Sequence, residues 1–220
     1  GKVYALVGPS GGGKSTIAKL ISALYPIDSG EILIGNKNIY SYKRETLMDN
    51  IGMVYQNPKL FQGISIFENV KLAKKDASDK EVYEALRLSK CDQFIDKFED
   101  GYDSIIGASG VNLSGGEIQR VSIARIFLKD PKVIILDEAS AAADPENEYE
   151  LQQAFKSLME GKTVIMIAHR LSSIRGVDEI LVVEDGNIIE RGSHDYLMEK
   201  EARYKQFVDL YDEANQWRIS

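Results

Sequence analysis

The chain has 220 residues, of which 44% are hydrophobic, so it can bury a substantial core, and its one cysteine, Cys91, excludes an internal disulfide. A net charge of −7 argues against broad electrostatic binding to nucleic acid or to anionic lipid, and we expect no nucleic-acid partner. No stretch approaches the roughly 20 apolar residues that span a bilayer.

The first predicted element is a strand over residues 3–7, and a glycine-rich loop follows it directly. The loop, here called the phosphate loop, has site residues Gly8, Ser10, Gly11, Gly12, Gly13, Lys14, Ser15 and Thr16. Glycines let successive backbone N–H groups point at phosphates, Lys14 adds a mobile positive charge, and Ser15 offers its hydroxyl to Mg²⁺. The next helix, with apolar positions from 17 to 24, directs its positive amino end at the same anion. The pattern predicts a nucleoside triphosphate site.

Two further segments precede residue 110. Residues 31–35 predict a short hairpin-like piece. Residues from about 66 to 106 show helical periodicity, with apolar side chains at Val82, Ala85 and Leu86 and charged residues between them. This periodicity is typical of an inserted helical subdomain.

A second candidate anion site lies at the start of the next predicted helix. It comprises Leu113, Ser114, Gly115, Gly116 and Glu117, here called the signature segment. A serine and two glycines at a helix start favour anion binding. Ser114 and Glu117 also have the spacing of a capping box, so a well-capped helix without a ligand is the structural alternative.

Three continuous apolar runs then predict a central, mostly parallel sheet, at residues 133–136, 163–167 and 180–183. Asp137 and Glu138 follow the first run, where one carboxylate can hold Mg²⁺ while the next activates water. Asp144 is a natural N-cap for the crossover helix between the first two runs. A turn at residues 185–186 predicts a second hairpin-like piece, so we expect a small antiparallel patch beside the main sheet.

The order of these motifs resembles that of the nucleotide-binding domain of ABC transporters over nearly the whole chain. Gln56 and His169 complete that order, and the segments 101–107 and 168–174 are most similar to the exporter type. The resemblance implies an α/β P-loop NTPase with a mostly parallel central sheet, a small antiparallel β patch and an inserted helical subdomain. It implies one ABC ATPase domain over residues 1–220. Residues 1–65 and 130–220 would form its RecA-like core with the β patch, and about 66–129 its helical subdomain with the signature segment.

The function that the resemblance implies is that of the ATP-hydrolysing motor domain of an ABC exporter, with ATP and Mg²⁺ as cofactors. In that family two ATPase domains pair head to tail, so each ATP lies between the phosphate loop of one and the signature segment of the other. The partner would be a second ABC ATPase domain, in a homodimer or a heterodimer. A transmembrane domain, fused upstream, would place this chain on the cytoplasmic side of a membrane.

Site roles follow from the same resemblance. Ser15, Gln56 and Asp137 would coordinate Mg²⁺, and Glu138 would be the general base for the attacking water. His169 would contact the γ-phosphate, and Asp144 would lie in the loop that faces the opposite site. The loop after Gln56 would dock the membrane domain, with Leu60 and Phe61 exposed for that contact; the alternative is that these two side chains belong to the core of the helical subdomain.

Some positions depart from the family pattern. Glu117 replaces a glutamine and adds a negative charge near the triphosphate unless it caps Ser114; Ala141 and Ala143 replace serine and leucine, and Ala108 replaces glutamate.

The adenine-stacking aromatic residue of the family lies upstream of Gly1, so we expect the chain to be part of a longer polypeptide. Two alternatives stay open: a soluble ABC-type ATPase that acts on DNA or ribosomes, and a nucleotide-binding half-site with weak turnover.

Overall fold

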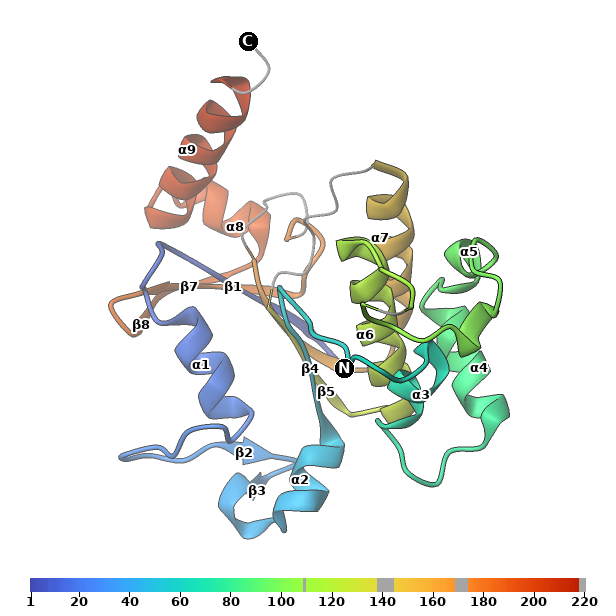
Figure 1. Cartoon of the computed structure of the whole chain (residues 1–220). Helices are drawn as coiled ribbons and strands as arrows, with labels where there is room; N and C mark the ends of the chain where they lie inside the picture. Colours follow the sequence, from blue (N-terminus) through green and yellow to red (C-terminus); the bar gives the residue numbers. More distant parts are fainter. Residues whose placement is uncertain (109, 138–144, 169–173, 218–220) are drawn as a thin grey trace. The chain divides into compact units, whose positions relative to one another are not determined.

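The structure is a computed structural model that describes residues 1–108, 110–137, 145–168 and 174–217 (Figure 1). Its strands are β1 (Val3–Val7), β2 (Leu33–Ile34), β3 (Lys37–Asn38), β4 (Ile51–Val54), β5 (Val133–Asp137), β6 (Thr163–Ile167), β7 (Glu179–Glu184) and β8 (Asn187–Gly192). Its helices are α1 (Lys14–Ile21), η1 (Ile39–Ser41), α2 (Arg44–Asn50), α3 (Ile66–Lys71), α4 (Asp79–Leu88), α5 (Asp92–Ile95), η2 (Gly101–Asp103), α6 (Gly115–Lys129), α7 (Pro145–Met159), α8 (His194–Glu199) and α9 (Arg203–Trp217).

The described strands form a six-stranded sheet in the order β4-β5-β6-β1-β7-β8 and a separate two-stranded sheet of β2 and β3. β1 runs parallel to both β6 and β7, with Ala5 opposite Met166 on one side and Ile180 on the other. The predicted mostly parallel sheet and α/β fold class are confirmed. The apolar runs identified in the sequence became β5, β6 and β7 because strands covered on both faces need no polar alternation.

The second predicted hairpin, at the turn of residues 185–186, is confirmed. β8 pairs antiparallel with β7 and extends the main sheet, so the separate patch consists of β2 and β3 alone. The reason is the tight turn between β7 and β8, where Asp185 (φ 49°) and Gly186 (φ 75°) both have positive φ. Such a two-residue turn matches the twist of its flanking strands and keeps the second strand beside the first.

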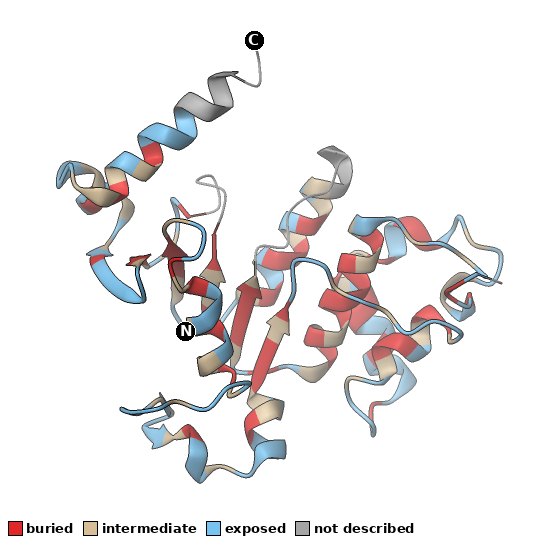
Figure 2. Cartoon of the chain, turned by 60° about the vertical axis from the view of Figure 1, so that its left-hand side comes forward, coloured by how far each residue is buried: buried red, intermediate tan, exposed pale blue. Residues whose placement is uncertain are grey.

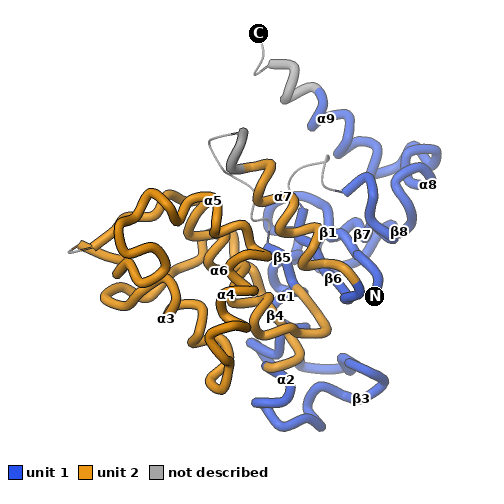
Figure 3. Tube along the Cα trace, turned by 90° about the vertical axis from the view of Figure 1, so that its right-hand side faces the viewer, with its two compact units in different colours: residues 1–48, 135–138, 161–220 blue, residues 49–134, 139–160 orange. Residues whose placement is uncertain are grey.

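The chain divides into two compact units (Figure 3). The first unit contains residues 1–48, 135–138 and 161–220. One core cluster of this unit joins β1 and β7 to α8 and α9, with Ala5, Val182, Leu197 and Tyr204 among its buried members (Figure 2). The apolar side chains of α8 and α9 therefore pack on the sheet within this unit.

The second unit contains residues 49–134 and 139–160, and its core lies among α3, α4 and α6. Val82, Ala85 and Leu86 are buried on one face of α4, as their spacing predicted. Capping boxes start α3 at Ser65 and α4 at Ser78. The helical character predicted for residues 66–106 is confirmed, whereas the predicted domain boundaries stay a prediction.

The described helices include none that combines the length and the apolar composition needed to cross a bilayer.

Candidate functional site

The phosphate loop lies between β1 and α1 in the first unit. Gly8, Gly11 and Gly13 have φ of 142°, 80° and 106°, a backbone region that residues with a side chain rarely adopt. Gly13 is the N-cap of α1 and provides no side-chain acceptor, so it leaves the N–H groups of the first helical turn uncapped. An uncapped helix start behind a glycine-rich turn is suited to bind an anion.

β7 lies so close to the phosphate loop that residues 8 and 12 have no room for a side chain. A Cβ at Gly8 would lie 2.1 Å from the carbonyl oxygen of Val183, and one at Gly12 would lie 2.8 Å from the same oxygen. The N–H of Gly186, in the turn after β7, donates to the carbonyl oxygen of Gly12 at 3.0 Å. The end of the β7–β8 hairpin therefore holds the phosphate loop in its conformation.

Lys14 is bound inside this loop. Its side chain is 5% exposed, and Nζ donates to the carbonyl oxygens of Gly8 at 2.9 Å and Pro9 at 2.8 Å. Burial lowers the pKa of Lys14, because desolvation disfavours the charged form. Ser15 and Thr16 are exposed at the start of α1. The loop thus presents hydroxyl groups, backbone N–H groups and a cation that is already held close to the backbone.

Of the other residues predicted to bind Mg²⁺ and to activate water, the structure describes Asp137 and Gln56. Asp137 is the last residue of β5, is partly exposed and belongs to the same unit as the phosphate loop. Gln56 is exposed just after β4 and belongs to the second unit. Glu138, Asp144 and His169 lie outside the described residues, as do Ala141 and Ala143. The roles assigned to all of these residues stay predictions.

The signature segment starts α6 in the second unit. Ser114 is the N-cap, and the predicted capping box is formed: Ser114 N–H donates to Glu117 Oε2 at 2.8 Å, and Glu117 N–H donates to Ser114 Oγ at 3.4 Å. Ser114 and Gly115 are nevertheless exposed, and a Cβ at Gly115 would meet no atom within 4 Å. The packing of this chain does not require glycine at residue 115, in contrast to Gly8 and Gly12.

Glu117 is 5% exposed, and its carboxylate forms an ion pair with Lys97. Burial alone would raise the pKa of Glu117, but the Lys97 ammonium group and the Ser114 N–H outweigh it, so the pKa lies below its ordinary value. The carboxylate that departs from the family pattern therefore binds groups of its own chain.

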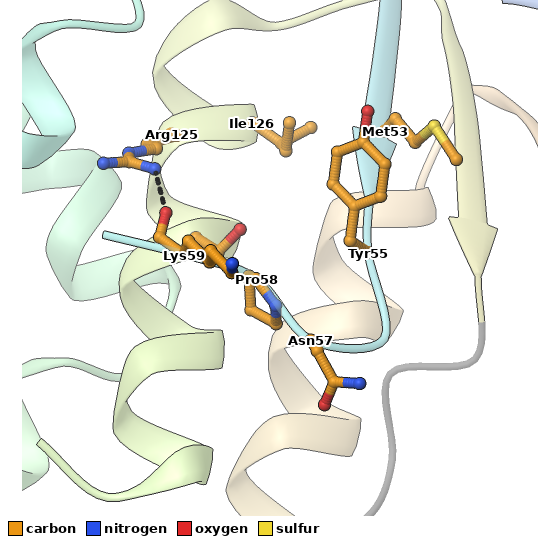
Figure 4. A pocket seen from close by; sticks show the side chains of 8 residues that line it. Met53, Tyr55, Asn57, Pro58, Lys59, Arg125 and Ile126 are labelled. Atoms are coloured by element: carbon orange, nitrogen blue, oxygen red, sulfur yellow. Dashed lines mark hydrogen bonds between the residues drawn. The ribbon is translucent and has the colours of Figure 1, made fainter. Parts of the chain in front are cut away.

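The segment after Gln56 borders a pocket of about 360 Å³ (Figure 4). The pocket is lined by residues of β4, of the following loop and of α6: Met53, Tyr55, Asn57, Pro58, Lys59, Ser122, Arg125 and Ile126. The Arg125 guanidinium group donates to the carbonyl oxygen of Lys59 at 3.1 Å and to that of Asn69 at 2.8 Å. It thereby holds the loop against α6.

The exposure predicted for Leu60 and Phe61 was correct for only one of them. Phe61 is 60% exposed, whereas Leu60 is partly buried and packs against the core of the second unit. Asn69 explains the loop geometry, because this buried side chain accepts the N–H of Phe61 at 2.8 Å and donates to its carbonyl oxygen at 3.0 Å. Sequence analysis missed Asn69 and Lys97; the available signal for Asn69 was a polar residue in a helical segment among the apolar Ile66, Phe67 and Val70.

Comparisons with known proteins agree with the family resemblance. The family model for the ABC transporter matches residues 1–141. Two ATP-dependent lipid A-core flippases are 47% and 46% identical to this chain over 207 residues, from Pasteurella multocida (strain Pm70) and Vibrio vulnificus (strain CMCP6). Each match covers 94% of this chain and 35% of the flippase. ABC transporter B family member 13 of Arabidopsis thaliana is 42% identical over 212 residues, which are 96% of this chain and 17% of that protein. The chain thus spans about a third of the bacterial relatives' length.

Proposed function

The chain belongs to the ABC transporter family, and on that premise we propose that it is the ATP-hydrolysing motor domain of an exporter. The observation that carries this proposal is the phosphate loop, whose glycine conformations, uncapped helix start and buried Lys14 are suited to bind an anion. The similarity to flippases over 94% of the chain supports the exporter class. It gives no support to the alternative of a soluble ATPase that acts on DNA or ribosomes.

ATP would bind with its phosphates on the amides of the phosphate loop. Lys14 would exchange its two carbonyl acceptors for phosphate oxygens, which are stronger acceptors for an ammonium group. The hydroxyl of Ser15, the amide oxygen of Gln56 and the carboxylate of Asp137 would hold Mg²⁺, since this ion prefers oxygen ligands. Mg²⁺ when bound would neutralise phosphate charge. Glu138 would accept a proton from the attacking water, and His169 would contact the γ-phosphate.

We further propose that the site is completed by a second ABC ATPase domain, identical or different. Its signature segment would cover the nucleotide, with Asp144 in the loop between the two sites. The exposed Ser114 and Gly115 support this arrangement, because both residues at the start of α6 face solvent and a Cβ built at Gly115 would meet no atom within 4 Å. ATP would join the two domains, and hydrolysis would let them separate.

The membrane partner is also part of the proposal. A transmembrane domain, fused upstream, would contact the pocket after Gln56 and the exposed ring of Phe61, which lies 5.4 Å from the Arg125 guanidinium group. An exposed aromatic ring beside a pocket is suited to receive a helix of another domain. This arrangement would put the chain on the cytoplasmic side of a membrane, where ATP is available.

The test is ATP turnover together with the Glu138→Gln variant. We expect the wild-type chain to release phosphate from ATP with Mg²⁺, and Glu138→Gln to lose at least about 100-fold in rate while it sediments as an ATP-dependent dimer. Glu99→Gln, at an exposed carboxylate, is the matched control and should keep normal turnover. Absence of turnover in the wild type would refute the motor function, and unchanged turnover in Glu138→Gln would refute the assigned base.

A further inference from the structure

The charge of Glu117 is compensated from a distant part of the second unit. Lys97 lies between α5 and η2, and its ammonium group pairs with Glu117, the third residue of α6. The same ammonium group lies 5.7 Å from the ring centroid of Phe94 and 5.0 Å from that of Phe98. The aromatic rings and the carboxylate together hold Lys97 against the start of the signature helix.

Residues 92–103 offer no second cation, and the other cation of this cluster is the buried Arg120 of α6, whose guanidinium group lies 4.9 Å from the Phe94 ring. Residues 92–103 contain five carboxylates, at Asp92, Asp96, Glu99, Asp100 and Asp103, whereas Lys97 is their one basic residue. Loss of the Lys97 charge would leave Glu117 without its ion-pair partner, with the carboxylate still on the Ser114 N–H. The buried carboxylate would then cancel part of the positive potential at the start of its helix, which is the potential that attracts a phosphate.

We propose that Lys97 is a positioning residue for the nucleotide bound by the partner domain. Its ammonium group neutralises Glu117 and keeps that carboxylate on the Ser114 N–H, so the start of α6 remains attractive to a phosphate. This inference rests on the proposed function, because it requires the signature segment to cover a triphosphate. It explains how the chain accommodates a glutamate where the family has a glutamine.

The experiment measures pairing of the 220-residue chain by analytical ultracentrifugation with Mg²⁺ and a non-hydrolysable β,γ-imido analogue of ATP. Lys97→Met removes the charge and keeps an unbranched side chain over the aromatic rings, and Lys97→Arg is the conservative control. We expect Lys97→Met to raise the dimer dissociation constant about tenfold and Lys97→Arg to restore it. The difference should shrink at about 1 M salt, where charge repulsion is screened.

The same measurement in the Glu117→Gln variant distinguishes this positioning role of Lys97 from a purely structural role. In Glu117→Gln the neutral side chain can still accept the Ser114 N–H, so Lys97→Met should no longer weaken pairing there. Binding of the analogue to the monomer, at the phosphate loop of the other unit, should be the same in all variants. A structural role would instead lower the thermal midpoint of the nucleotide-free chain without changing the dissociation constant of the folded dimer.

The outcomes are distinct. If the wild type pairs and Lys97→Met pairs equally well, or is equally impaired in both backgrounds, the inference is wrong and the proposed function stands. If the wild type neither pairs nor hydrolyses ATP, both are wrong. Should Lys97→Met fail to fold, Lys97→Gln retains a hydrogen-bond donor for Glu117 without the charge and must show the same tenfold weakening.

Discussion

Substitution of Gly8 by alanine tests whether β7 shapes the phosphate loop. The new Cβ would lie 2.1 Å from the Val183 carbonyl oxygen and 3.1 Å from its carbon, both backbone atoms of a central strand. Gly8 also has a φ of 142°, which alanine adopts only with strain. Relief of either problem requires the loop to move away from the strand.

The cost can be estimated from these two contributions. Backbone strain costs about 1–3 kcal/mol, and overpacking against atoms that cannot yield costs about 1–3 kcal/mol more. We therefore expect Gly8→Ala to lower the free energy of unfolding by about 2–6 kcal/mol. Gly11 has a φ of 80° but no atom within 4 Å of a built Cβ, so Gly11→Ala should cost only about 1 kcal/mol.

Urea unfolding followed by far-ultraviolet circular dichroism measures both variants. Gly115→Ala is the control, because residue 115 starts a helix and a Cβ there would meet no atom within 4 Å. Its free energy of unfolding should be unchanged or higher by up to about 0.5 kcal/mol. Equal losses for Gly8→Ala and Gly11→Ala would refute the argument that contact with Val183 sets the loop geometry.

Three further predictions concern the second unit. Asn69→Ala should lower the free energy of unfolding by about 2–4 kcal/mol in urea titrations, because it leaves buried backbone groups around Phe61 without partners, whereas the exposed Asn57→Ala should change it by less than about 0.5 kcal/mol. Burial raises the pKa of the Cys91 thiol to about 12, so iodoacetamide at pH 8 should label Cys91 in urea but not in the folded chain. The lowered pKa of Glu117 means that its contribution to stability is complete above about pH 4.3 and is lost as the pH falls through the folded-state value, so Glu117→Gln should show a shallower acid loss of stability.

Each of these has a clear contrary result. Equal destabilisation by Asn69→Ala and Asn57→Ala would mean that the buried amide does not hold the loop. Rapid labelling of Cys91 under native conditions would mean that the thiol is accessible. Parallel acid unfolding curves for the wild type and Glu117→Gln would mean that the carboxylate gains nothing from its partners on folding.

The sequence predicted best those features that depend on local pattern. β1 and its loop, the three buried strands and the capping box at Ser114 follow from apolar runs, glycines and residue spacing. The hairpin of β7 and β8 also follows from its turn residues, which specify a close return but not the sheet that the returning strand joins. That choice depends on which strand edge is free.

Contacts between distant segments could not be predicted in this way. Lys97 and Glu117 are 20 residues apart, and Arg125 lies 66 residues from Lys59. Nothing in the spacing identifies these partners, because the connecting helices and loops determine where each side chain ends. Burial of Leu60 was missed for the same reason: a short loop held by Asn69 turns one apolar side chain inward and its neighbour outward.

The support of Gly12 by Val183 and Gly186 has a consequence for the order of events during synthesis. The loop emerges from the ribosome first, but the hairpin that braces it follows roughly 9–35 s later at about 5–20 residues per second. Until then the nascent chain lacks the scaffold that keeps its glycines in place. The contacts that keep the phosphate-loop glycines in place are therefore completed only after residues 183–186 have been synthesised.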